Sequence, residues 1–196
     1  MPVSASLCWL SDTPPELIAQ MFQWLSPKEA IALRRLSRGI NACISTKFFA
    51  RMSLYAATTS EGTSSTMSRA HCELFLRAPA SFKAVLVQIN STITEFCYNG
   101  NRNDGEKSPD TIPADLSRLS HLEHVAIESS CLIGPIVHVS DLSSLKTLNL
   151  FGNALTGAIP TTLSRQLTSL SLDLNTISSP IPASLGSLRS FIISSV

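Results

Sequence analysis

The chain has 196 residues, and its 15 Lys and Arg residues against 14 Asp and Glu residues give a net charge of +1. Hydrophobic residues make up 44% and charged residues only 15%, so we expect a neutral surface rich in hydroxyl groups. This composition excludes a basic field for nucleic acid, and no apolar run reaches the roughly 18 residues that predict a membrane span.

Residues 7–54 are predicted to form three short helices. The first follows Pro14 and Pro15 and carries apolar residues at helical spacing, and the second begins at Ser26-Pro27, with Ser as N-cap and Pro in the first turn. A third apolar stretch covers 40–49. A core of this size is marginal on its own.

Three groups in this segment, Pro14-Pro15-Glu16-Leu17-Ile18, Ser26-Pro27-Lys28-Glu29-Ala30 and Leu36-Ser37-Arg38, resemble the F-box motif in order and spacing. The segment departs from the motif at Ile40, where a tryptophan is usual. The resemblance implies that a ubiquitin-ligase adaptor subunit binds to Pro14, Pro15, Leu17, Ile18, Leu25 and Leu33. The alternative is a helical cap that only shields the apolar end of the neighbouring domain.

Residues 55–92 are interpreted as a linker and a transition segment. Residues 55–69 are small and polar without an apolar pattern, which is typical of a linker. Further on, the apolar run 74–76 predicts a helix and the run 84–87 predicts a strand.

Three later segments repeat one skeleton, L-x-x-L-x-L-x-x-N, and they begin at Leu122, Leu145 and Leu167. The L-x-L part predicts a short strand that points two side chains inward. The polar residue at the following bend is expected to bond backbone groups as a structural ladder, and that position is filled by Ser130, Asn153 and Asn175. Because one repeat cannot bury its apolar face alone, the copies should stack into a solenoid.

These repeats resemble the leucine-rich repeat family, in the variant with N-x-L-x-G-x-I-P after the strand, and residues 153–160 match it closely. A degenerate earlier copy covers 93–99, and another begins at Ile181. The predicted fold class is α/β, with a short helical F-box-like domain at 7–54 followed by a leucine-rich-repeat solenoid at 93–196 that is incomplete at its C-terminus.

Strand residues between the leucines should form aligned columns on one concave sheet face. The expected target-binding residues on that face are His124, Glu128, Asn149, Phe151 and Asp173. Phe151 stands between acidic neighbours and is the expected anchor, unless a neighbouring turn partly buries it.

No catalytic residue, metal site or cofactor is predicted, because His121 and His124 lack a third ligand at a suitable spacing and no glycine-rich phosphate loop occurs. The five cysteines are scattered without a C-x-x-C pair. Together with the lack of a recognisable signal peptide, they favour reduced thiols in the cytoplasm or nucleus.

The resemblances imply a substrate-recognition subunit of a cullin–RING ubiquitin ligase. Its N-terminal helices would bind the adaptor, and its repeats would hold an unknown target protein near the transferred ubiquitin, with no nucleic acid or membrane involved. The subunit would supply proximity and no chemistry. The alternative is an interaction scaffold with no ubiquitin role. A secreted or receptor-derived fragment is a third hypothesis, disfavoured by the missing signal peptide and missing paired cap cysteines.

Overall fold

The structure is a computed structural model that describes residues 65–100, 110–186 and 188–192, together with 14, 29, 32–33, 38, 41–42, 45–47, 49–51 and 54. The chain divides into two compact units. One comprises Met1–Thr63 and Ala78–Gln88, and the other comprises Ser64–Arg77 and Ile89–Val196. Within the described ranges, no helix has the length and apolar character needed to cross a bilayer.

Helix α6, Ala80–Ile89, belongs to the first unit except for its last residue, and the sequence predicted a strand at 84–87 instead. That prediction is wrong. The carbonyl of Pro79 accepts hydrogen bonds from the backbone N–H groups of Phe82 and Lys83 at 3.0 and 3.3 Å, which starts a helix. Phe82, Val85 and Leu86 then recur at helical spacing and are buried. A short apolar run fits a strand or a buried helix equally, and here the helical period decides.

The Phe82 ring packs against Phe49, with ring centroids 6.2 Å apart. Phe49, Ala50 and Leu54 are fully buried in the same unit. Most of the other residues of 7–54, where three helices were predicted, lie outside the described residues.

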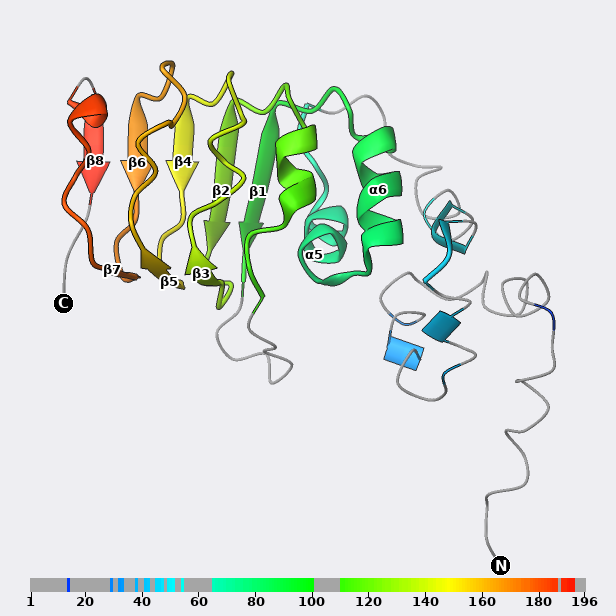
Figure 1. Cartoon of the computed structure of the whole chain (residues 1–196). Coiled ribbons are helices and arrows are strands. Elements are labelled where there is room, and N and C mark those ends of the chain that lie inside the picture. The colour runs from blue at the N-terminus through cyan, green and yellow to red at the C-terminus, as the bar shows by residue number, and fades with distance from the viewer. Residues whose placement is uncertain are drawn as a thin grey trace, which may run out of the picture. The chain divides into compact units, whose positions relative to one another are not determined.

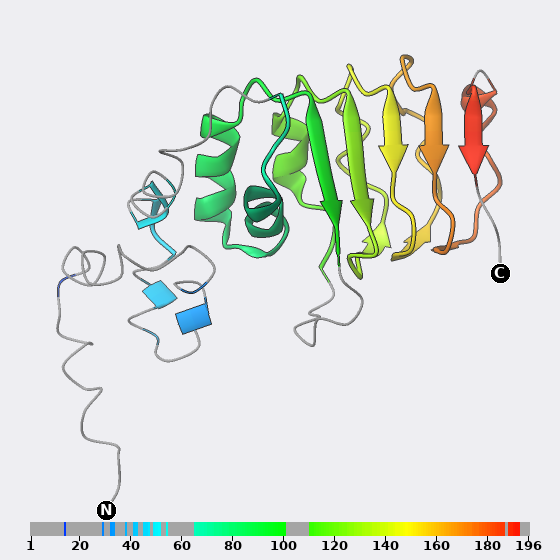
Figure 2. The ribbon, with the colours of Figure 1, turned by 180° about the vertical axis from the view of Figure 1, so that it is seen from behind.

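The second unit is built on two parallel sheets (Figures 1 and 2). The larger sheet has the strand order β1-β2-β4-β6-β8, formed by Glu95–Asn99, His124–Glu128, Thr147–Asn149, Ser169–Ser171 and Ser190–Ile192. The smaller sheet has the order β3-β5-β7, formed by Ile133–Pro135, Ala154–Gly157 and Thr176–Ile177. Each copy contributes one strand to the larger sheet and returns the chain to the same end, which makes the strands parallel.

The strand register follows the sequence repeat. Val125 pairs with Leu148, and Leu148 pairs with Leu170. These inward residues are buried, as are the first and third leucines of the skeleton, Leu122, Leu145, Leu150 and Leu172. The predicted α/β fold class is confirmed for the repeats, whose strands are parallel and whose inward leucines form the core.

The degenerate copy at 93–99 supplies β1, whose Phe96 pairs with Val125 of β2. Helix α5, Arg69–Arg77, packs against this end of the sheet, and its Phe75 ring meets Phe96 edge to face at 5.6 Å. Thr66 forms a parallel bridge with Glu95, and the Met67 N–H donates to the Glu95 carbonyl at 3.1 Å. The outer edge of β1 is therefore covered by residues of its own unit.

Two asparagine side chains tie successive bends together. Asn153 Oδ1 accepts from the backbone N–H groups of Ser130 and Leu132, both at 3.1 Å. The Asn175 amide acts in the same way one repeat later, accepting from Leu155 N at 3.0 Å and donating to Leu150 O at 2.8 Å. Ser130 contributes less, because its hydroxyl donates to the nearby Glu128 carbonyl at 2.7 Å.

The residue before each bend position has a left-handed backbone. The φ angles are +48° at Ser129, +69° at Gly152 and +53° at Leu174. Glycine adopts this region without strain, whereas a residue with a Cβ does not. The bend therefore has the same geometry in three copies, although only one copy has the residue that suits it.

Candidate functional site

The outward side chains of the larger sheet form columns that run across the strands. The first column is given by the pairing of His124 with Thr147 and of Thr147 with Ser169. The second is given by the pairing of Ala126 with Asn149 and of Asn149 with Ser171. All of these residues are half-buried, in contrast to the buried leucines that alternate with them. We call this surface the outward face.

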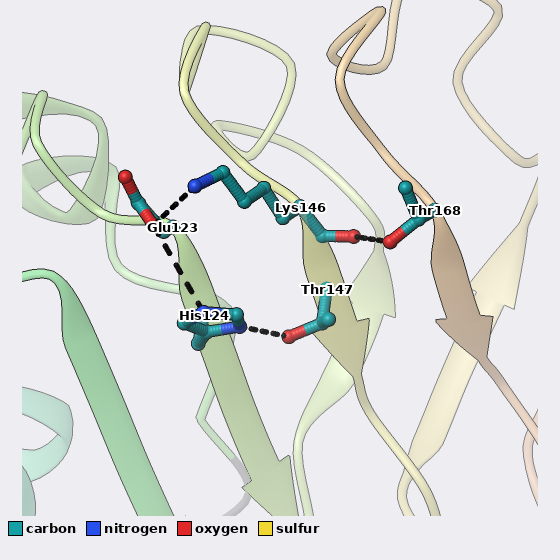
Figure 3. A network of polar contacts seen from close by, with 5 residues as sticks. All are labelled: Glu123, His124, Lys146, Thr147 and Thr168. Atoms are coloured by element: carbon teal, nitrogen blue, oxygen red, sulfur yellow. Dashed lines mark hydrogen bonds and ion pairs between the residues drawn. The ribbon is translucent and has the colours of Figure 1, made fainter.

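A polar network occupies one end of the outward face (Figure 3). Lys146 Nζ lies 2.6 Å from Glu123 Oε2, and this hydrogen bond holds the pKa of the Glu123 carboxyl below its usual range. His124 Nδ1 lies 2.8 Å from Thr147 Oγ1, and its Nε2 is 4.0 Å from Glu123 Oε2. The Lys146 charge is therefore already paired within the face.

Amide side chains hold Glu128 at the opposite ends of the strands. Asn149 Nδ2 donates to Glu128 Oε1 at 2.7 Å, and Asn99 Nδ2 lies 3.4 Å from Oε2. Asn149 Oδ1 also accepts from the Phe151 N–H at 3.1 Å. Asn149, expected as a target contact, thus also positions two other expected contacts, Glu128 and Phe151.

Phe151 follows β4 and stands between Glu128 and Asp173. The Ser129 N–H donates to the Phe151 carbonyl at 3.0 Å, and the Gly152 N–H donates to the Asp173 carbonyl at 2.9 Å. These bonds extend the column beyond the paired strands. Phe151 is half-buried, which agrees with the partial burial that the sequence left as the alternative to an exposed ring.

Cys97 of β1 is exposed on the outward face, and it pairs in register with Ala126. Burial raises the pKa of its thiol, and the negative charges of Glu95 and Glu128 raise it further. Cys72 of α5 is fully buried, and burial raises its pKa to about 12. The Cys72 thiol donates weakly to the Met67 carbonyl at 3.7 Å.

Of the six residues expected to bind an adaptor, Pro14 is exposed and Leu33 is half-buried. Pro15, Leu17, Ile18 and Leu25 lie outside the described residues. Across the described ranges, no group of three or more His, Cys, Asp or Glu residues is arranged to hold a metal ion.

Glu123, Lys146 and Cys97 also belong to the outward face, and none of the three was predicted from the sequence. The repeat contained the signal for the first two, because each directly precedes a residue of the first column, His124 or Thr147. Cys97 could have been found by extending the second column backward through Ala126 into the degenerate copy.

One family model supports the repeat assignment. Residues 144–165 match the family model described as Leucine Rich Repeat, and no F-box model matches the chain. No curated protein matches. Among solved structures, the chain is similar to the leucine-rich-repeat ectodomain of the receptor kinase SOBIR1 from Arabidopsis thaliana, with 27% identity and a TM-score of 0.48. That match covers 56% of this chain and 59% of the ectodomain.

A second similar structure is the Arabidopsis receptor kinase HAESA in complex with the peptide hormone IDA and the co-receptor SERK1. Its identity is 32% and its TM-score 0.48, over 59% of this chain and 19% of that one. A third is the BIR3–SERK2 complex from Arabidopsis thaliana, at 31% identity and a TM-score of 0.40, over 44% of this chain and 53% of that one. The chain thus spans about 59% or less of each of these relatives.

Proposed function

We propose that this chain binds a target protein through the outward face of the larger sheet. The observation that carries the proposal is the column register, which sets Asn149 between Ala126 and Ser171 and leaves all three half-buried. A row of hydrogen-bonded parallel strands with short side chains is a preorganised surface. Its own backbone therefore needs little rearrangement when a partner binds.

We further propose that residues 7–54 link that target to the adaptor of a cullin–RING ubiquitin ligase, in the cytoplasm or nucleus. The support is the sequence resemblance to the F-box motif, which runs from Pro14 to Arg38 in the motif's order. On this proposal the chain holds its target and performs no chemistry. The rival proposal is a leucine-rich-repeat scaffold whose N-terminal helices are only a cap.

A pair of crossed variants tests both parts in one affinity purification. Ser171→Trp places a bulky neutral ring on the outward face and should abolish recovery of the target while leaving the adaptor. Ile18→Glu should abolish recovery of the adaptor, because a carboxylate would enter an apolar contact, while leaving the target. Gln166→Trp adds the same ring at an exposed position outside the sheet and serves as the control.

Circular dichroism and melting of each variant check that the repeats remain folded. If no adaptor is recovered with the wild-type chain, the scaffold replaces the ligase subunit. If Ser171→Trp and the wild type recover the same proteins, the outward face is not the binding surface.

A further inference from the structure

The column at the ends of the outward strands brings an aromatic ring between two carboxylates. Glu128, Phe151 and Asp173 occupy consecutive rungs, joined by the backbone bonds from Ser129 N and Gly152 N. Neighbouring rungs of a sheet lie about 4.8 Å apart, so the two acidic residues flank the ring at about 10 Å from each other. A planar side chain that donates hydrogen bonds on both sides could therefore lie between the two carboxylates.

The two carboxylates have no positive partner among the described residues. No ion pair in that part of the chain involves Glu128 or Asp173. Among the described residues, the Glu128 carboxylate accepts amide hydrogens from Asn149 and Asn99, and Asp173 Oδ1 accepts the Leu174 N–H at 2.9 Å. Each oxygen keeps a lone pair for a further donor.

The other charges on the outward face also favour the binding of a positively charged group near Glu128 and Asp173. Lys146 is held 2.6 Å from Glu123, so it does not neutralise Glu128. Burial is the main cause of the raised pKa of the Cys97 thiol, and the negative charges of Glu95 and Glu128 raise that pKa further. Glu128 and Asp173 therefore add two negative charges to this end of the face, and no cation among the described residues pairs with them.

The geometry points to a peptide segment that presents an arginine as the occupant of the Glu128–Phe151–Asp173 column. A guanidinium would stack on the Phe151 ring and donate to the flanking carboxylates, which uses its planar face and its forked donors together. A lysine ammonium offers a point charge without a planar face and fits the column less well. The inference rests on the proposed function and names the chemistry of the partner.

The test selects random dodecapeptides displayed on phage against the intact chain and then measures the affinity of synthetic versions of the selected sequences. We expect arginine to be enriched over lysine. Replacing that arginine by citrulline, which removes the charge and keeps the shape, should weaken binding about tenfold or more.

The variant Glu128→Gln with Asp173→Asn should cause a loss of the same size, and Phe151→Leu should also weaken binding. Asp141→Asn removes an exposed carboxylate of the same unit away from the sheet and should leave the affinity unchanged. Raising the salt concentration should weaken wild-type binding and have little effect on the doubly neutralised variant.

The outcomes separate this inference from the proposed function. If Ser171→Trp blocks the selected peptides but citrulline and the neutral variants bind as the originals do, the arginine assignment is wrong and the outward face still binds. If no peptide is selected, or none is blocked by Ser171→Trp, the inference and the proposed function both fail.

Discussion

Asn153 Nδ2 donates to the carbonyl oxygen of Ile127, which belongs to the preceding repeat, at 2.7 Å. The same nitrogen lies 2.9 Å from the Leu150 carbonyl of its own repeat, and Oδ1 accepts two N–H groups of the preceding bend. One side chain thus satisfies backbone groups of two consecutive bends.

Asn153→Ala should therefore lower the free energy of unfolding by about 3 kcal/mol, the upper end of the cost of leaving buried polar groups unpaired. Chemical denaturation followed by circular dichroism measures it. Asn149→Ala is the matched control: it removes bonds to Glu128 and Phe151 on the half-buried face and should cost about 1 kcal/mol or less. Equal losses for the two variants would contradict the role assigned to Asn153.

Leu174→Gly should raise the free energy of unfolding by up to about 1 kcal/mol. The Leu174 backbone has φ +53° and its side chain is 41% exposed, so the change relieves strain and sacrifices little burial. The gain is reduced because glycine loses more entropy on folding. The converse change, Gly152→Ala, should cost about 1–2 kcal/mol at φ +69°. If Leu174→Gly is destabilising, the left-handed bend is not strained there.

Lys146→Met should raise the pKa of Glu123 towards its ordinary value of 4.5, because the hydrogen bond from Lys146 is the main cause of the lowered pKa. Since the folded-state pKa lies below the unfolded one, the pair adds stability above pH 4.5 and loses it as the pH falls. Carbon-detected NMR titration of the Glu123 carboxyl measures the shift. Arg165→Met removes an exposed cation outside the sheet and should leave the titration unchanged.

The buried Cys72 thiol should make the repeats less stable at alkaline pH. Its pKa is raised from 9.0 to about 12 in the folded chain, so above pH 9 the unfolded chain releases a proton that the folded chain retains. The free energy of unfolding therefore falls as the pH rises from 9 towards 12. Denaturation of Cys72→Ala over the same range should show a shallower decline. Parallel slopes for wild type and variant would show that Cys72 does not titrate in this way.

The buried leucine positions could be predicted because each copy places apolar residues at the same spacing. Val125, Leu148 and Leu170 occupy equivalent positions, so the sequence alone indicated their pairing. Helix α6 could not be assigned in the same way. Its apolar run occurs once, without a repeat to show its period, and a run of that length fits a strand as well as a helix.

The columns of residues on the outward face could be predicted from the sequence, but the hydrogen bonds between their side chains could not. The positions of Glu128, Asn149 and Phe151 followed from the repeat, but the bonds from Asn149 to both neighbours depend on side-chain rotamers that no spacing reveals. The left-handed backbone at Leu174 could not be predicted either. Of the equivalent residues Ser129, Gly152 and Leu174, only the glycine is of a type that indicates this geometry.

The strand order β1-β2-β4-β6-β8 has a mechanical consequence. Each strand is hydrogen-bonded only to its immediate neighbours, and the bonds between neighbours point along the row of repeats. A force that draws β1 and β8 apart would therefore be carried by every interface in series, and the sheet would open first at its weakest interface. Pulled along the strands instead, the same interfaces would be sheared with all their bonds loaded together and would resist far more.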